Sequence, residues 1–122
     1  MTNFPLDLES QPVVIPVLAG EGKTSALLEA RETWAGRTVW TTARNRLIAT
    51  ETGRAAGAGD ANALSTAMLR EQIAKGQGPT AGDVLVVDEV DLLAREDVEL
   101  ILDLAKLGVI VDALGDLKQS GE

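Results

Sequence analysis

The residues best suited to chemistry lie in a glycine-rich segment, Gly20-Glu21-Gly22-Lys23-Thr24. Its glycines let the backbone turn and expose its amides, and a helix beginning near Lys23 adds unpaired N–H groups that favour an anion. We expect Lys23 to contact the terminal phosphates of a nucleotide and the Thr24 hydroxyl to reach Mg²⁺. Val17 stands where the pattern G-x-x-x-x-G-K-[ST] has its first glycine, and the alternative is a glycine turn with a surface lysine. The predicted nucleotide-binding residues are Gly20, Glu21, Gly22, Lys23, Thr24 and Ser25.

A second candidate is the acidic pair Asp88-Glu89, which directly follows the apolar run Val84-Leu85-Val86-Val87. An aspartate in this position holds Mg²⁺ through its water shell, and a neighbouring glutamate orients or activates the attacking water. The alternative is that Asp88 caps a turn while Glu89 is solvated. Because an acidic pair of this kind follows a phosphate loop, the two motifs together favour a nucleotide site more strongly than either does alone.

A third polar cluster, Gly115-Asp116-Leu117-Lys118-Gln119, follows the last apolar run of the chain. A glutamine near a terminal phosphate senses that phosphate by hydrogen bonding, and Gln119 is the candidate for this role. A polar turn without a ligand is the open alternative.

Four apolar or β-branched runs predict strands, and four helical patterns alternate with them. The strands are expected over residues 13–18, 38–42, 84–87 and 109–114, and the helices over 23–35, 43–56, 64–75 and 94–107. This alternation predicts βαβ units and a mostly parallel sheet, although Pro16 is awkward in a strand because it cannot donate to a ladder. Ligands bind at the carboxyl ends of parallel strands, so we expect the three clusters to form one site.

The composition excludes several classes of site. The chain has 122 residues and contains neither cysteine nor histidine, so it has no disulfide framework, no zinc site of the usual soft ligands and no Cys–His or Ser–His–Asp catalysis. No apolar run approaches the roughly 20 residues that cross a bilayer, and no membrane contact is expected. The first five residues lack the basic region and apolar core of a secretory signal, so a cytoplasmic protein is expected.

The net charge bears on nucleic-acid binding. A formal charge of −8 has the wrong sign for a protein that neutralises phosphates with Lys and Arg. The charge is uneven, however, because four arginines and a single acid, Glu51, lie between residues 37 and 54. Contact with single-stranded DNA through Arg44 and Arg46 is therefore a hypothesis, and we expect such binding to be weak in this chain alone.

With these motifs, the chain resembles the first motor domain of superfamily-1 DNA helicases, and most of all the helicase-like part of relaxases encoded by conjugative plasmids. The phosphate loop of that family reads G-x-A-G-T-G-K-T, from which Val17 and Glu21 depart. The segment 82–89 is similar to the acidic motif of the family, and the segment 41–44 resembles the part that touches single-stranded DNA. The residues that match the phosphate loop and the G-D-x-x-Q motif are Ala19, Gly20, Gly22, Lys23, Thr24, Gly115, Asp116 and Gln119.

The resemblance covers about residues 11–119 and implies a three-layer α/β fold of the phosphate-loop NTPase (RecA-type) class that uses ATP and Mg²⁺. It implies catalytic roles for Lys23, Glu89 and Gln119, and a metal site at Thr24 and Asp88. Such motors need a second similar domain, so we expect one motor lobe: a fragment, a remnant, or a subunit completed by a second lobe in trans. Weak or no ATPase activity is expected in isolation. Residues 1–122 are expected to form one domain, with residues 1–10 flexible or peripheral.

Two other interpretations stay open. The segment 22–28 also resembles the loop and helix of compact tetrameric thymidine kinases, in which Glu89 would be the base that activates the nucleoside hydroxyl. The segment 115–122 resembles the D-F-x-G-E segment of these kinases only loosely, and their cysteine-bearing zinc lobe is absent. The other interpretation is a non-catalytic binding or assembly module with a vestigial phosphate loop, which the departures at Val17 and Glu21 support.

Overall fold

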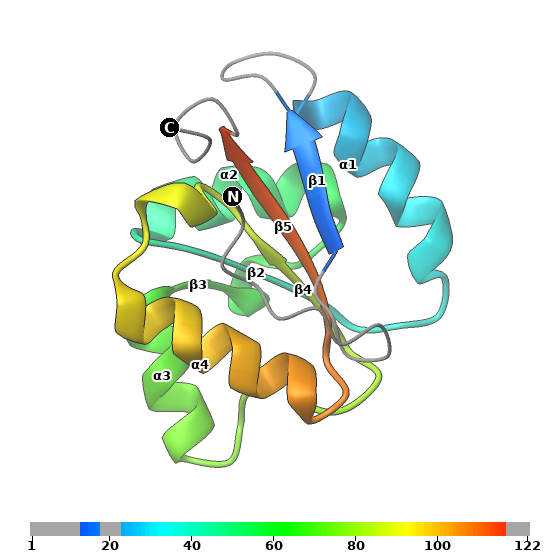
Figure 1. The fold of residues 1–122 in the computed structure, drawn as a ribbon. Coiled ribbons are helices and arrows are strands. Elements are labelled where there is room, and N and C mark those ends of the chain that lie inside the picture. The colour runs from blue at the N-terminus through cyan, green and yellow to red at the C-terminus, as the bar shows by residue number, and fades with distance from the viewer. Residues whose placement is uncertain (1–12, 18–22, 117–122) are drawn as a thin grey trace.

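The computed structural model describes residues 13–17 and 23–116, with side chains for residues 27–115. Five strands and four α-helices alternate along this part of the chain (Figure 1). None of the described helices is long and apolar enough to span a bilayer. The strands are β1 (Val13–Val17), β2 (Val39–Ala43), β3 (Ala63–Ser65), β4 (Val84–Val87) and β5 (Ile110–Asp116). The helices are α1 (Lys23–Arg31), α2 (Arg46–Ala56), α3 (Thr66–Ala74) and α4 (Arg95–Lys106), with short 3₁₀ turns η1 (Glu32–Trp34), η2 (Asp60–Asn62) and η3 (Val90–Leu92).

The strands form one sheet in the order β1-β5-β4-β2-β3, and every neighbouring pair is parallel. The register aligns Val17 with Asp116 and Val87 with Ala113. All five strands therefore end on the same side of the sheet, which we call the carboxyl edge. The predicted α/β fold with a parallel sheet is confirmed, and the predicted meeting of strand ends follows from it.

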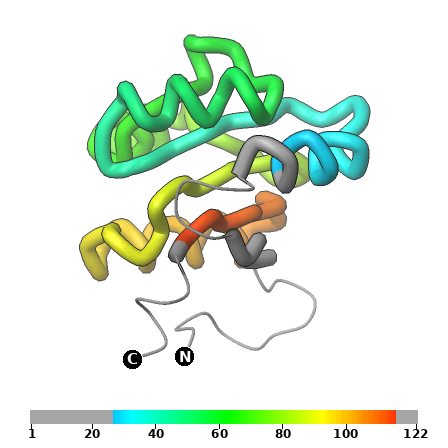
Figure 2. The backbone as a smooth tube through the Cα atoms, turned by 90° about the horizontal axis from the view of Figure 1, so that it is seen from above, coloured from blue at the N-terminus to red at the C-terminus, as the bar shows by residue number. Residues whose placement is uncertain are grey.

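Helices cover both faces of the sheet, which gives three layers. Val84 and Val86 of β4 pack with residues of α1, η1 and α2, whereas Leu85 and Val87 pack with residues of α3 and α4. All four are fully buried, which explains why this strand is a continuous apolar run. Seen from above in Figure 2, α2 (green) lies on one side of the strands and α4 (yellow to orange) on the other.

The position of β1 explains how a proline fits into a strand. Within the described sheet β1 is an outer strand that pairs with β5 alone. Pro16 lacks the N–H group that an inner strand needs for its ladders on both sides, but an outer strand tolerates this loss. The difficulty expected at Pro16 is thus removed by the strand order, which the sequence does not reveal.

The short strand β3 was not predicted. The apolar spacing predicts one helix over residues 64–75, whereas Ala63–Ser65 form a strand beside β2 and the helix begins at Thr66. The Ser65 side chain accepts a hydrogen bond from Met68 N at 3.2 Å and so caps α3. The helical spacing of the apolar residues continues across this cap, which is why the sequence predicts helix for Leu64 and Ser65 of this edge strand.

Two other helices, α1 and α2, are also shorter than predicted. The helix expected from residue 43 begins at Arg46, because Asn45 accepts a hydrogen bond from Ile48 N at 2.9 Å and acts as its N-cap. The helix expected over residues 23–35 ends at Arg31 and continues as the 3₁₀ turn η1.

Candidate functional site

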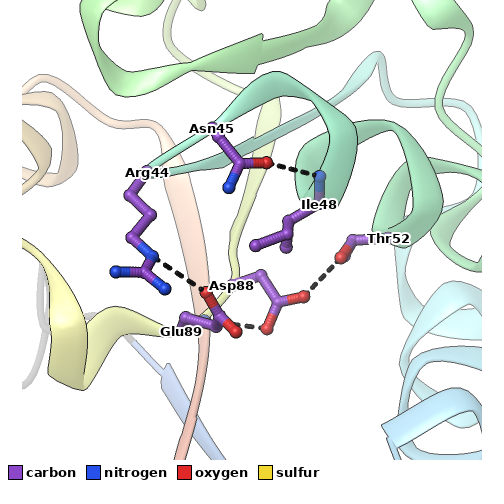
Figure 3. Close-up of polar contacts among 6 residues, drawn as sticks. All are labelled: Arg44, Asn45, Ile48, Thr52, Asp88 and Glu89. Carbon is purple, nitrogen blue, oxygen red and sulfur yellow. Dashed lines mark hydrogen bonds and ion pairs between the residues drawn. The ribbon is translucent and has the colours of Figure 1, made fainter.

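The carboxyl edge brings together the ends of β2 and β4 with the start of α2. Arg44 and Asn45 follow β2, and Asp88 and Glu89 follow β4. Figure 3 shows that Arg44 points toward Glu89, while Thr52 of α2 points toward Asp88. The predicted acidic pair and the predicted Arg44 are thus neighbours, although more than 40 positions of the sequence separate them.

 The parallel pairing of β2 with β4 is what creates this cluster.

Asp88 is a buried carboxylate whose two oxygens are both held. Its side chain is on the α2 face of the sheet, and the residue is 2 % exposed. Oδ2 accepts a hydrogen bond from Thr52 Oγ1 at 2.5 Å, and Oδ1 accepts one from Glu89 N at 2.8 Å. Its backbone N donates to Thr42 O at 2.9 Å. Charge-assisted hydrogen bonds of this kind offset the cost of burying a carboxylate, and they fix its orientation.

Thr52 is a site residue that the sequence analysis missed. It lies in the middle of α2 and is 3 % exposed. The helix approaches β2 closely at this point, because a Cβ at Gly53 would lie 3.1 Å from Thr41 Oγ1. The signal in the sequence is the small buried face of the helix, made by Ala49, Thr52, Gly53 and Ala56.

Glu89 has an unusual backbone and a partly buried carboxylate. Its φ of 53° and ψ of 45° place it in the left-handed region, which a non-glycine residue adopts only where its surroundings hold it there. Its Oε1 is buried and has no hydrogen-bond partner among the described residues. Arg44 forms an ion pair with this oxygen, with its Nε at 3.5 Å. This oxygen therefore retains the capacity to accept a hydrogen bond, for example from a water molecule.

The arginines of residues 37–54 do not form one basic face. Arg37 lies at the opposite edge of the sheet, where it donates to Gly82 O at 2.9 Å. Arg44 and Arg46 are exposed at the carboxyl edge, and the guanidinium of Arg44 is paired with Glu89. The two arginines predicted to contact DNA thus lie near the acidic pair, but their role stays a prediction.

The predicted phosphate loop lies only partly within the described residues. β1 ends at Val17 on the carboxyl edge and α1 begins at Lys23, so the strand that should precede such a loop and the helix that should follow it are present. Lys23, Thr24 and Ser25 form the first turn of α1, of which the backbone alone is described. The other predicted residues, Gly20, Glu21, Gly22 and Gln119, lie outside the described residues, as do residues 1–10, and their roles stay predictions.

A second buried carboxyl, Asp112, was not singled out from the sequence. It lies in the middle of β5, between Val13 and Val86, and is 5 % exposed. Burial raises the pKa of Asp112, and a side-chain hydrogen bond with Trp34 lowers it in part. This carboxyl lies away from the ends of the strands. Its burial disfavours the charged form, so the core is less stable when Asp112 is ionised than when it is protonated.

The acids within the described part of the chain do not by themselves make a metal site. No group of three or more acidic side chains gathers there in a way that could hold a cation. Magnesium is commonly bound by one or two carboxylates together with water and substrate phosphates. Asp88 fits that mode of binding, because its side chain is a carboxylate and it directly follows β4 at the carboxyl edge.

A comparison with protein families agrees with this geometry. The family model for the AAA domain matches residues 8–122, nearly the whole chain. This chain belongs to the AAA domain family. A search of curated proteins finds no match to it. AAA domains of the phosphate-loop type are nucleotide-binding NTPase domains that typically bind ATP with Mg²⁺, which agrees with the predicted class of fold and of site.

Proposed function

We propose that this AAA domain binds Mg²⁺–ATP at the carboxyl edge and acts as one motor lobe related to superfamily-1 helicases and relaxases, with weak or no hydrolysis in isolation. One observation carries the proposal. A fixed, buried Asp88 and a Glu89 whose buried Oε1 has no hydrogen-bond partner in the described part of the chain lie together at the edge where α1 begins. One acid is held rigidly and the other can still accept a hydrogen bond, as expected of a metal-holding and a water-orienting residue.

The roles follow from the residue types. Lys23 and the amides of residues 20–25 would bind the phosphates, with the Thr24 hydroxyl and Asp88 holding the cation. Magnesium, when bound, neutralises charge on the phosphates. Glu89 would orient water through Oε1, and Gln119 would sense the terminal phosphate. Thr52 would keep the Asp88 carboxylate in place through its hydroxyl.

Thermal unfolding with and without Mg²⁺–ATP tests the proposal. A ligand that binds only the folded chain stabilises it, by about 2.7 kcal/mol at a hundred times its dissociation constant. We expect stabilisation of the unaltered chain that is lost in Lys23→Ala. Lys75→Ala is the matched control, because Lys75 is exposed and follows α3 at the opposite edge of the sheet from the site. The control should keep the full response.

The outcomes separate the alternatives. Further stabilisation by thymidine would support the kinase interpretation against the motor lobe. No response to either ligand would contradict nucleotide binding and favour an assembly module with a vestigial loop. Equal responses in Lys23→Ala and Lys75→Ala would place any binding away from the phosphate loop.

We also propose contact with single-stranded DNA through Arg44 and Arg46, and completion by a second lobe in trans. The support for the DNA contact is that both arginines are exposed at the carboxyl edge. Calorimetric titration with an oligonucleotide at low salt should detect weak binding that falls with salt. Arg46→Ala should weaken it and Arg95→Ala should not, since Arg95 lies on α4 and pairs with Glu99. Binding that ignores salt would contradict the proposal.

A further inference from the structure

The left-handed backbone of Glu89 must be held by its surroundings. Among the described residues Glu89 is the one non-glycine residue with a positive φ. Local hydrogen bonds form around it: Glu89 N donates to Asp88 Oδ1 at 2.8 Å, and Leu92 N donates to Glu89 O at 2.9 Å. These bonds close the turn but do not anchor it to the sheet. The following 3₁₀ turn η3 packs against β5, which connects the turn to the sheet.

Gly115 is the point of β5 on which this turn rests. It lies two residues beyond Ala113, just as Glu89 lies two residues beyond Val87, with which Ala113 is paired. Gly115 is buried, and a Cβ added to it would lie 2.9 Å from Val90 Cγ1 and 3.1 Å from Asp91 Oδ1. The first separation is too short for two carbon atoms, and the β-branched Val90 has little freedom to turn away.

The glycine is required here by space and not by backbone conformation. Gly115 has no positive φ, unlike Gly57 or Gly108. Alanine could adopt its backbone, but the added methyl group would displace η3. Because Val90 is also packed against the apolar core beneath α3 and α4, the displaced turn has to move as a unit.

We propose that Gly115 is a positioning residue for Glu89: its missing side chain seats η3 against β5 and thereby fixes the backbone of the water-orienting acid. The catalytic part of this inference rests on the proposed function. It also links two predicted clusters, since Gly115 directly precedes Asp116 at the end of β5. A shift at this end of β5 would be transmitted to Glu89 through Val90.

The test uses four variants of the full chain. Gly115→Ala adds a Cβ that clashes with Val90 Cγ1, and Val90→Ala removes this Cγ1 atom. The double variant Gly115→Ala/Val90→Ala should relieve the clash. Gly59→Ala is the matched control, because Gly59 has no positive φ and a Cβ there would meet nothing within 4 Å.

The first measurement is the Cα and Cβ chemical shifts of Glu89, which report its backbone conformation without any need for activity. They should move in Gly115→Ala, return in the double variant and stay unchanged in Gly59→Ala. The second is the hydrolysis rate at saturating nucleotide, which should fall by about tenfold or more in Gly115→Ala while nucleotide affinity changes by less than about threefold. The double variant should recover part of the rate.

The proposal would be overturned if the chemical shifts of Glu89 were the same in Gly115→Ala as in the unaltered chain. It would also be overturned if these shifts did not return to their original values in the double variant. If Gly115→Ala fails to fold, the double variant decides, because it folds only if the clash with Val90 is the cause. A chain that binds no nucleotide would refute the proposed function, while the chemical shifts would still decide whether Gly115 seats the turn.

Discussion

Asp88 and Glu89 are adjacent in sequence but differ in how they are held. The Asp88 carboxylate is buried and accepts hydrogen bonds from the Thr52 hydroxyl and from the backbone N–H of Glu89. The Glu89 side chain is partly exposed and faces the guanidinium of Arg44. Alternation along the strand directs Asp88 to the α2 face, and the left-handed backbone of Glu89 turns its side chain toward Arg44. The Asp88 carboxylate is therefore held in one orientation, whereas the Glu89 carboxylate can exchange its ion pair with Arg44 for another partner.

Loss of the Thr52 hydroxyl should destabilise the chain. Thr52→Val leaves one oxygen of a buried carboxylate without its donor, which costs about 1–3 kcal/mol. Thr52→Ser should retain most of the stability and the Mg²⁺-dependent nucleotide affinity that Thr52→Val loses. Urea denaturation measures the first effect and calorimetric titration the second.

The matched control is Thr41→Val, which removes an equally buried hydroxyl that donates to the neutral Ala49 O at 2.8 Å. Hydrogen bonds to charged groups contribute more than those to neutral groups, so this change should cost less. If Thr41→Val cost as much as Thr52→Val, the special role of the Thr52–Asp88 pair would be refuted.

Removal of the Arg44 cation should alter activity more than stability. Arg44 and Glu89 form a half-exposed pair at 3.5 Å, and such pairs contribute at most about 1 kcal/mol. In Arg44→Gln, Glu89 loses its competing cation, so we expect any hydrolysis to rise. Arg95→Gln breaks the more exposed pair with Glu99 and should leave hydrolysis unchanged. A fall in Arg44→Gln would show that the pair assists Glu89.

Among the elements, α2 links the most parts of the site. Its N-cap Asn45 follows Arg44, and its Thr52 reaches Asp88. The helix can lie this close to β2 because its buried face is made of small residues, with Gly53 against Thr41. A substitution that destabilises the first turn of α2 should therefore also disturb the position of the Asp88 carboxylate.

Truncation of Asn45 should reveal that link. Asn45→Ala removes the acceptor of Ile48 N and should cost about 1 kcal/mol, as N-cap losses typically do. Ser65→Ala removes the corresponding cap of α3 and should cost a similar amount. Only Asn45→Ala should weaken Mg²⁺–ATP binding, which calorimetric titration would show. Equal affinities in both variants would mean that α2 does not position Asp88.

The elements also show what the sequence could predict. The apolar run of residues 84–87 gave β4 with its exact bounds, because a strand buried on both faces needs apolar residues at every position. The strand β3 was missed because Leu64 and Ser65 continue the helical pattern of α3. Asp88 and Glu89 were identified by their place after β4. Thr52 and Gly115 acquire their importance from contacts across the fold, and no local pattern records such contacts.

Across the whole molecule, Asp112 makes stability depend on pH. The folded-state pKa is raised above 3.8, so the folded chain binds this proton more tightly than the unfolded chain does. Its contribution to stability is present below pH 3.8 and is lost as the pH rises through the raised pKa. Once the pH exceeds the raised pKa, the core holds a buried charge, and the hydrogen bond with Trp34 offsets part of its cost.

Asp112→Asn should remove this dependence, because the amide is never charged and its oxygen can still accept from the Trp34 indole. Compared with the unaltered chain, the variant should gain stability between about pH 4 and about pH 7. Urea midpoints of both proteins at the two pH values measure the gain. A difference between them that does not vary with pH would show that Asp112 is not the group responsible.

The two tryptophans occupy opposite faces of the same sheet. Trp34 is buried beside Asp112 on the α1 face, whereas Trp40 packs toward α3 and α4 and donates from Nε1 to Asp83 Oδ2 at 3.1 Å. The sequence has no tyrosine, so intrinsic fluorescence arises from these two indoles. A Trp40→Phe chain would report optically on the layer that carries α1, and a Trp34→Phe chain on the opposite layer. Events on each side of the sheet can thus be followed in real time without any attached dye.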